Sequence, residues 1–191
     1  MFNIFLEDGA FTRARTKLVR GLFRQLMEGL KYTHSKGICH ADMSLENVLV
    51  DRTRTKAYII DYGMSLLMPI DEEYRRLQSL PDGRKAKSSY CSPETFKEKA
   101  YDGVKVDVFA TGSMLFMMLT GAYPFAIASR LDRKFKLLVV KGNVKETIGP
   151  NRLELMPRGN QAAELLGGMM AYDPKKRLLP DQVLHHAWFA H

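Results

Sequence analysis

Apolar residues near the start of the chain recur at every fourth position. They are Leu18, Leu22, Leu26 and Leu30. This spacing places them on one stripe of an α-helix. Thr12 can cap the start of the helix, because its hydroxyl can accept a hydrogen bond from an amide of the first turn. Gly37 can end it, because glycine adopts the left-handed conformation without strain. The pattern predicts one amphipathic helix between these two positions.

The periodicity then changes. Two short apolar stretches, 47–50 and 57–60, flank the polar turn D-R-T-R-T, which predicts a small antiparallel hairpin. Residues 69–89 are mostly polar and contain Pro81-Asp82-Gly83, so we expect a long loop there. The remaining predicted helices cover about 107–120, 130–140, 160–171 and 180–187. The predicted fold is therefore mainly α-helical, a helical bundle with one small β-hairpin.

One uncharged stretch, residues 108–129, is long enough to cross a bilayer. However, Gly112, Gly121 and Pro124 interrupt it, and its apolar centre is short. The run from Met114 to Leu119 fits a helix that is buried on all sides. We therefore expect a core helix and no membrane partner.

Composition and charge are those of an ordinary globular chain. Of 191 residues, 46% are apolar and 26% are charged, which is typical of soluble proteins. The length suits one domain. The 29 basic and 21 acidic residues give a net charge of +8. Because the basic residues are spread along the chain, solvated helix faces explain them and we expect no nucleic-acid partner.

Two cysteines, Cys39 and Cys91, are too few for a disulfide framework and favour a reducing compartment. The first residues have no basic segment and no long apolar stretch, so we expect no signal peptide. The predicted location is the cytoplasm, with the nucleus as an alternative.

Polar side chains gather at both ends of the predicted hairpin. The run from His40 to Asn47 precedes it, and Asp61-Tyr62-Gly63 follows it. Because the outer ends of a hairpin lie side by side, Asp42, Asn47 and Asp61 can converge. Carboxylate and amide oxygens are the ligands that hold Mg²⁺ with substrate phosphates, and a separate carboxylate can accept a proton from a hydroxyl. Each residue alone is more typical of a turn, but the ordered set fits phosphoryl transfer.

These motifs resemble those of the protein kinase family. The run from His40 to Asn47 is similar to the catalytic loop H-R-D-L-x-x-x-N, and Asp61-Tyr62-Gly63 is similar to the D-F-G metal motif. Further landmarks follow in the family's order: Ser92-Pro93-Glu94 (like A-P-E), Asp107 to Gly112 (like D-x-W-x-x-G), Tyr123-Pro124-Phe125, Asp173 to Arg177, and the terminal L-H-H-A-W-F. The set spans most of the chain, so chance agreement is not a reasonable explanation.

The resemblance implies catalytic and cofactor-binding roles. Asp42 would be the catalytic base that orients the substrate hydroxyl, and Asn47 and Asp61 would hold Mg²⁺ against the ATP phosphates. The expected ATP-contacting residues are Met1, Ser44, Glu46 and Leu49. Met114 and Met118 also match family positions near the adenine, although their spacing fits core packing equally well.

The resemblance also implies structural roles around the site. His40 and Tyr62 would stack, with Gly63 completing the metal motif. Asp107 would hold the backbone of the catalytic loop. Glu94 would form a buried ion pair with Arg177.

Several positions depart from the family's pattern. Ala41 replaces an arginine that binds an activation-loop phosphate in many kinases, so control by that route is not expected. Ser44 replaces a lysine that meets the transferred phosphate, which removes a positive charge. Tyr62 replaces phenylalanine, and Lys87 lies where many serine/threonine kinases have a threonine.

The resemblance further implies a single domain, residues 1–191, that corresponds to the C-terminal lobe of a kinase. This lobe is mainly α-helical and belongs to the α+β class. The family's Gly-rich loop, strand lysine and helix glutamate would lie before the first helix, and nothing of that kind is found in the sequence. We therefore expect that the N-lobe is absent and that the pocket for ATP has one wall.

The expected function is ATP-dependent phosphoryl transfer to a serine or threonine hydroxyl of a protein substrate. The serine/threonine preference rests on D-M-S-L-E-N, which lacks the arginine-rich loop of tyrosine kinases. A separate N-lobe or another partner would cover the face around Met1, Leu49 and Tyr62. The alternatives are an inactive, pseudokinase-like binding module or a truncated fragment. A small-molecule phosphotransferase fits less well, because Glu94, Asp107 and Arg177 resemble the apparatus specific to protein kinases.

Overall fold

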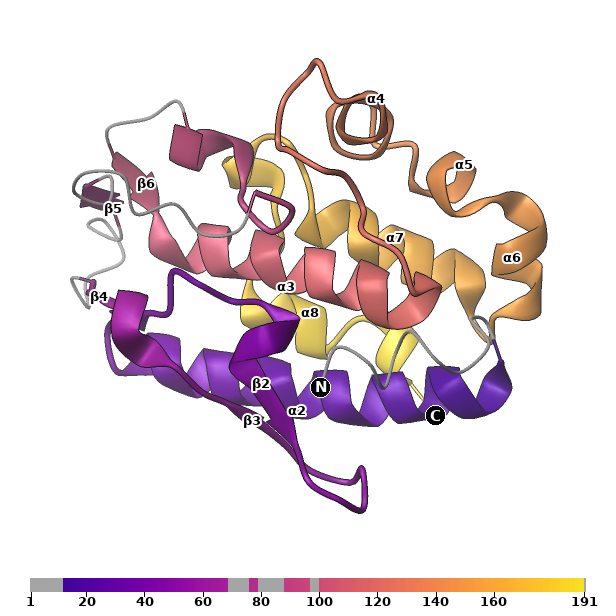
Figure 1. The fold of residues 1–191 in the computed structure, drawn as a ribbon, viewed down its shortest axis with the longest axis horizontal. Coiled ribbons are helices and arrows are strands. Elements are labelled where there is room, and N and C mark those ends of the chain that lie inside the picture. Colours follow the sequence, from indigo (N-terminus) through magenta and orange to yellow (C-terminus); the bar gives the residue numbers. More distant parts are fainter. Residues whose placement is uncertain (1–11, 69–75, 79–87, 97–99, 191) are drawn as a thin grey trace.

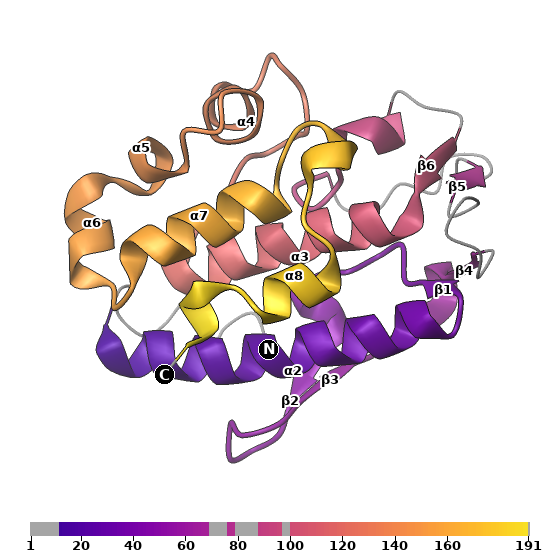
Figure 2. The ribbon, with the colours of Figure 1, turned by 180° about the vertical axis from the view of Figure 1, so that it is seen from behind.

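Two long helices organise the molecule. The computed structural model describes residues 12–68, 76–78, 88–96 and 100–190. Figures 1 and 2 show helix α2 along one side of the molecule and helix α3 beside it. Helix α7 packs on α3, helix α8 packs on α2, and strand β3 contacts α2. The mainly helical fold that the sequence predicts is confirmed.

Helix α2 (Arg13–Ser35) has the caps that its sequence predicts. The Thr12 hydroxyl accepts a hydrogen bond from the Arg15 amide at 3.2 Å. Gly37 follows the helix with a φ of 69°, in the left-handed region that favours glycine. The predicted stripe faces the core, and Phe23 and Met27 beside it are completely buried. This prediction is therefore confirmed at both ends and along the buried face.

Helix α3 (Gly103–Thr120) is the buried centre of the fold. Every side chain from Val106 to Leu119 is buried. In the described part of the chain, it is the one helix that is long and apolar enough to cross a membrane. However, 89% of this apolar helix is buried inside the protein. It starts four residues earlier than predicted, because the Asp102 carboxylate caps it by accepting from the Lys105 amide at 3.2 Å. The prediction of a core helix is confirmed.

Strands β2 (Val48–Val50) and β3 (Ala57–Ile59) form the predicted antiparallel hairpin. Val48 and Ile59 face each other, as do Leu49 and Tyr58. The inner side chains pack on the main core, and Gln25 of α2 hydrogen-bonds to the backbone of Thr55 and Ala57. The outer pair remains 54% and 52% exposed at Leu49 and Tyr58. The hairpin is thus fixed on one face and uncovered on the other.

The remaining strands are very short and were not predicted from the sequence. Strand β1 (Ile38–Cys39) pairs with β4 (Leu66–Leu67), and β5 (Arg76–Gln78) pairs with β6 (Ala100–Asp102). The expected loop at 69–89 therefore contains a strand, while most of that range lies outside the described residues. Strands of two or three residues are too short to show a periodic pattern in the sequence. They form because each pairs with another segment of the folded chain.

The C-terminal half is helical, as predicted, but more finely divided. Its elements are α4 (Arg133–Phe135), a π-helix (Lys136–Val140), α5 (Val144–Ile148), α6 (Pro150–Leu155), α7 (Gly159–Met169) and α8 (Pro180–Leu184). Helices α5 and α6 were not predicted, because five or six residues are too short for a periodic signal. The predicted helix at 180–187 ends at Leu184, and a 3₁₀ turn (Ala187–Phe189) follows it.

Candidate active site

A buried carboxylate holds the segment between β1 and β2. Asp107 of α3 is completely buried. Its Oδ2 accepts from the His40 amide at 2.8 Å, and its Oδ1 accepts from the Ala41 amide at 2.9 Å. Ala41 has a φ of 61°, a strained conformation for a residue with a side chain. Because hydrogen bonds to an ionised acceptor are strong, they can hold this strained backbone. The contact that the resemblance implies between Asp107 and this backbone is present.

His34 is a third partner of Asp107 that no local sequence pattern indicates. Its Nε2 lies 2.9 Å from Asp107 Oδ2, and the two side chains are 7% and 1% exposed. His34 Nδ1 is buried without a hydrogen-bond partner in the described part of the chain. His34 lies in the last turn of α2, so it ties this helix to α3. Its distance of 73 residues from Asp107 in the sequence explains why no local pattern revealed it.

Asp42 and Asn47 meet, as the sequence predicts. The Asn47 Nδ2 donates to both the backbone oxygen and the Oδ2 of Asp42, each at 2.8 Å. Asn47 is 8% exposed and ends a 3₁₀ turn (Leu45–Asn47), whereas Asp42 is half-buried. Because the amide hydrogens of Asn47 point to Asp42, its amide oxygen is the atom that remains suited to a metal ion.

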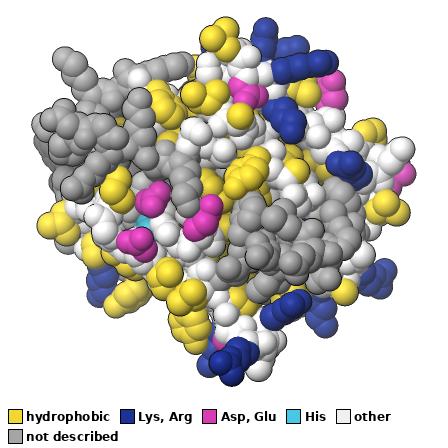
Figure 3. Space-filling view, viewed as in Figure 1, with side chains coloured by type: hydrophobic (Ala, Val, Ile, Leu, Met, Phe, Trp, Pro, Cys, Tyr) yellow, Lys and Arg dark blue, Asp and Glu magenta, His cyan; other side chains and the backbone are white. Residues whose placement is uncertain are grey.

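Asp61 follows the hairpin, two residues beyond the end of strand β3. The Ile60 amide donates to the Asn47 backbone oxygen at 2.9 Å, so the hairpin brings position 61 alongside Asn47. Asp61 itself is exposed and left-handed, with a φ of 61°. The hydrogen bond of its carboxylate is with the Gly63 amide, at 3.2 Å, rather than with Asp42 or Asn47. A Cβ on Gly63 would lie 3.1 Å from Asp61 Oδ1, so glycine leaves room for this carboxylate. Figure 3 shows acidic side chains gathered on this face, beside exposed apolar ones.

His40 and Tyr62 are in contact, as expected. Their ring centroids are 4.8 Å apart with the planes tilted by 54°. His40 is completely buried and its Nε2 lies 3.1 Å from the Ile60 oxygen. The Tyr62 hydroxyl lies 3.2 Å from the Thr33 hydroxyl of α2. The hydroxyl that distinguishes Tyr62 from the family's phenylalanine thus has a partner within the fold.

The residues that are expected to contact ATP differ in their exposure to solvent. Leu49 and Glu46 are exposed, whereas Ser44 is completely buried and its hydroxyl has no hydrogen-bond partner among the described residues. Met1 and Lys87 lie outside the described residues. The structure therefore does not present Ser44 at the surface, because its neighbours Met43 and Leu45 pack into the core.

Met114 and Met118 belong to the core. They are 0% and 1% exposed and lie within the main apolar cluster. Core packing, one of the two interpretations of their spacing, accounts for them in this structure.

Glu94 and Arg177 form the expected buried ion pair. The Arg177 Nη1 and Nη2 donate to the two carboxylate oxygens at 2.5 and 3.1 Å. Arg177 also donates to the backbone oxygens of Lys105 and Ala171, and its guanidinium lies 4.9 Å from the centre of the Phe109 ring. With 3% and 1% exposure, this bidentate pair joins three separate segments.

Ala41, which departs from the family's arginine, packs in a second apolar cluster. Its members are Cys39, Ala41, Met68, Tyr101, Val104 and Val106. The Met68 amide donates to the Gly37 oxygen at 2.6 Å. This hydrogen bond holds the end of strand β4 against the same cluster. Burial, followed by the charge of Asp107, raises the pKa of the Cys39 thiol well above its usual value. Cys39 therefore stays protonated and serves packing.

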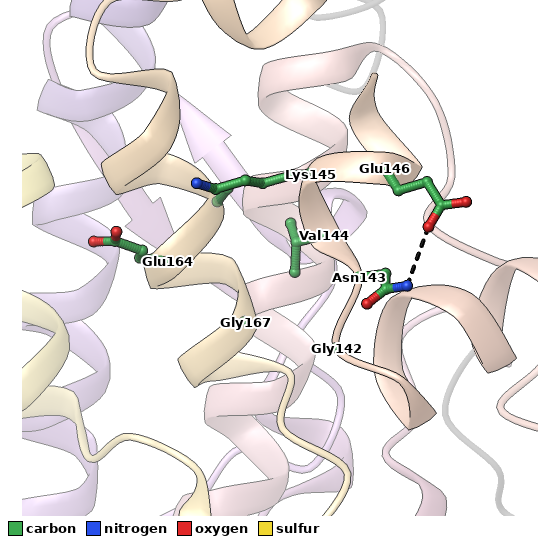
Figure 4. A pocket seen from close by; sticks show the side chains of 8 residues that line it. Gly142, Asn143, Val144, Lys145, Glu146, Glu164 and Gly167 are labelled. Carbon is green, nitrogen blue, oxygen red and sulfur yellow. Dashed lines mark hydrogen bonds between the residues drawn. The ribbon is translucent and has the colours of Figure 1, made fainter. Parts of the chain in front are cut away.

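Two grooves lie elsewhere. Between α5 and α7, a groove of about 490 Å³ is lined by small and charged side chains. Figure 4 shows Asn143 and Glu146 hydrogen-bonded at one edge of it, at 3.1 Å. A second groove of about 490 Å³ lies between α2 and α8. Neither groove is lined by Asp42, Asn47 or Asp61.

Comparison with known proteins agrees with this geometry. A family model described as a protein kinase domain matches residues 2–189. CBL-interacting protein kinase 25 of Oryza sativa subsp. japonica is 30% identical over 183 residues, 95% of this chain and 32% of the relative. Serine/threonine-protein kinase SRK2E of Arabidopsis thaliana is 32% identical over 190 residues, 99% of this chain and 49% of the relative. The chain thus spans about a third to a half of the length of these curated relatives. It belongs to the protein kinase domain family.

Proposed function

We propose that the protein transfers the γ-phosphoryl group of Mg²⁺-ATP to a serine or threonine hydroxyl of a protein substrate. The observation that carries this proposal is the double hydrogen bond from Asn47 to Asp42, on a loop that Asp107 holds from below. Family membership and the relatives named serine/threonine-protein kinases support the reaction and the acceptor class.

Asp42 is the proposed catalytic base. Its Oδ2 accepts from Asn47, so Oδ1 is the oxygen free to orient the substrate hydroxyl and take its proton. Asp42 is half-buried, so part of the residue faces solvent. Positioning of this kind is the main protein contribution to phosphoryl transfer, since little covalent chemistry falls to side chains.

Asn47 and Asp61 fit a magnesium ion by their donor chemistry. The amide oxygen of Asn47 and a carboxylate oxygen of Asp61 are hard ligands on neighbouring backbone positions. Mg²⁺ usually takes one or two protein ligands, and waters and phosphate oxygens complete its shell. When bound, the ion would neutralise charge on the transferred phosphoryl group. Among the described residues, no group of three or more His, Cys, Asp or Glu side chains is suited to a metal.

The exposed face of the hairpin is the proposed floor for the nucleotide. Leu49 of the hairpin is 54% exposed, and Tyr62 in the 3₁₀ turn that follows it is 43% exposed. A separate N-lobe or another partner would cover both. With Ser44 buried where the family has a lysine, less positive charge stands near the phosphoryl group, so we expect slow transfer. We also propose a cytoplasmic or nuclear location, with no nucleic-acid or membrane partner.

Radiolabelled phosphate transfer to a mixed peptide library tests the proposal. We expect no transfer above background from the 191-residue chain alone, because two metal ligands cannot position ATP. The same chain joined behind a kinase N-lobe should transfer slowly. Robust, Asp42-dependent transfer by the chain alone would contradict the need for a covering lobe.

The second candidate function is an inactive, pseudokinase-like binding module. Ser44 favours this alternative, because it is buried and uncharged at a position where the family has a lysine. A joined protein that folds and binds Mg²⁺-ATP but transfers nothing would select this alternative.

A further inference from the structure

One buried tyrosine connects the segment at 88–96 to the candidate active site. Tyr90 is 2% exposed. Its hydroxyl accepts from the Leu45 amide at 3.4 Å and lies 3.3 Å from Glu46 Oε2, to which it donates. Leu45 and Glu46 stand between Asp42 and Asn47, so one side chain contacts the centre of the loop that carries both.

The contacted backbone leads directly to Asn47. Residues Leu45–Asn47 form a single 3₁₀ turn, and the Asn47 amide donates to the Ser44 oxygen at 3.1 Å. A shift of the Leu45 backbone would therefore carry Asn47 with it. Such a shift would disturb both hydrogen bonds, of 2.8 Å each, from Asn47 to Asp42.

The hydroxyl of Tyr90 is a permanent donor. Burial, followed by the charge of Glu46, raises the pKa of Tyr90 far above its usual value. The hydroxyl therefore stays protonated near neutral pH. It can donate to Glu46 while its lone pairs accept from Leu45.

The segment that bears Tyr90 is itself anchored on both sides. Before it, the Ser88 hydroxyl donates to the Ala126 oxygen at 2.9 Å, and the Asp132 carboxylate holds the Ala126 amide at 2.9 Å. After it, Glu94 is held by Arg177. Tyr90 thus contacts the loop at Leu45 and Glu46 from a segment that is held at both of its ends.

We propose that Tyr90 is a positioning residue of the phosphoryl-transfer site. Its hydroxyl fixes the backbone at Leu45 and the carboxylate of Glu46, and through them keeps Asn47 hydrogen-bonded to Asp42. The effect on catalysis rests on the proposed function, whereas the effect on the loop does not. The arrangement couples the position of residues 88–96 to the position of the base.

Hydrogen exchange of the Leu45 amide in the full 191-residue chain tests the effect on the loop. Tyr90→Phe keeps the buried ring and removes the hydroxyl. We expect the Leu45 amide to exchange about two- to tenfold faster, the usual worth of one hydrogen bond. Tyr32→Phe, on the exposed face of α2, is the matched control and should leave this amide unchanged. Unchanged exchange in Tyr90→Phe would overturn the proposal.

Transfer kinetics of the chain joined to an N-lobe test the effect on catalysis. Tyr90→Phe should lower kcat about tenfold and leave the KM for ATP unchanged, because loop position rather than nucleotide binding is affected. Glu46→Gln keeps an oxygen acceptor and should retain more of kcat than Glu46→Ala. Equal losses in both Glu46 variants would contradict the proposed hydrogen bond.

The two measurements separate the possible failures. If wild type transfers nothing, the proposed function fails, and exchange at Leu45 alone decides whether Tyr90 holds the loop. If exchange rises while kcat stays at the wild-type value, the positioning role is wrong. If Tyr90→Phe does not fold, the surface variant Glu46→Ala removes the Tyr90–Glu46 hydrogen bond from the other side. Unchanged kcat in this variant would overturn the proposal.

Discussion

The two sides of the candidate active site differ in what holds them. On the buried side, Asp107 makes hydrogen bonds to His34, His40 and Ala41, and all of these partners belong to this chain. On the exposed side, Leu49 and Tyr58 face outward and are 54% and 52% exposed. The loop of the proposed catalytic base is thus held from within the chain, whereas the proposed nucleotide side presents exposed apolar side chains.

This difference separates two kinds of requirement. The positions of Asp42 and Asn47 depend on hydrogen bonds within the described residues. In the proposed function, holding a nucleotide would need contacts from a further partner as well. Variants on the buried side should therefore change stability and activity together, and variants on the exposed face should change association with little effect on stability.

The largest expected effect is the loss of transfer in variants of the metal ligand and the base. In the chain joined to an N-lobe, Asp61→Ala should abolish transfer by removing a metal ligand. Asp42→Asn should lower kcat by about 10²–10⁴, the usual worth of a positioned general base. Steady-state transfer assays measure both. Full activity in Asp42→Asn would show that another group is the base.

The next effect concerns the buried ion pair. Arg177→Ala should destabilise the chain by about 3–5 kcal/mol, because it leaves Glu94 buried without its partner. The double variant Arg177→Ala/Glu94→Gln should recover part of this loss, because the amide carries no charge. Thermal melting of both variants beside wild type is the measurement. A single variant that melts with wild type would show that the pair does not matter to the fold.

Asp107→Asn should have a smaller effect, a loss of about 1.5–3 kcal/mol in the free energy of unfolding. The amide keeps one oxygen acceptor but loses the charge that holds the His40 and Ala41 amides. Urea unfolding measures the change. Asp181→Asn is the control, because its pair with Lys31 is about half exposed and such pairs contribute about 0–1 kcal/mol. Equal losses in the two variants would contradict a special role for Asp107.

The smallest effect on stability is expected on the exposed face. We predict that the isolated chain self-associates through this face, since contiguous apolar surface favours association. Leu49→Ser/Tyr58→Ser should reduce self-association and change the free energy of unfolding by no more than about 0.5 kcal/mol. Sedimentation at tens of micromolar protein measures the association. A wild-type chain that sediments as a clean monomer would contradict the prediction.

The sequence alone determined the features that local patterns encode. The period of four, Thr12 and Gly37 define helix α2, and the unbroken apolar run defines α3 as a core helix. The polar turn between two apolar stretches defines the hairpin. The predicted hairpin indicated that Asp42 and Asn47 would converge, and the resemblance to protein kinases implied that Glu94 would pair with Arg177.

Only the tertiary structure decided the contacts between distant segments. His34 and Asp107 are 73 residues apart, and Tyr90 and Leu45 are 45 apart. The short strands, likewise, exist because their partners are packed nearby. Burial of Ser44 and of Met114 follows from how α2, α3 and the loop enclose a common core. Caps and periodicity act over a few residues and can be seen in a sequence, whereas these contacts depend on which surfaces meet after the chain has folded.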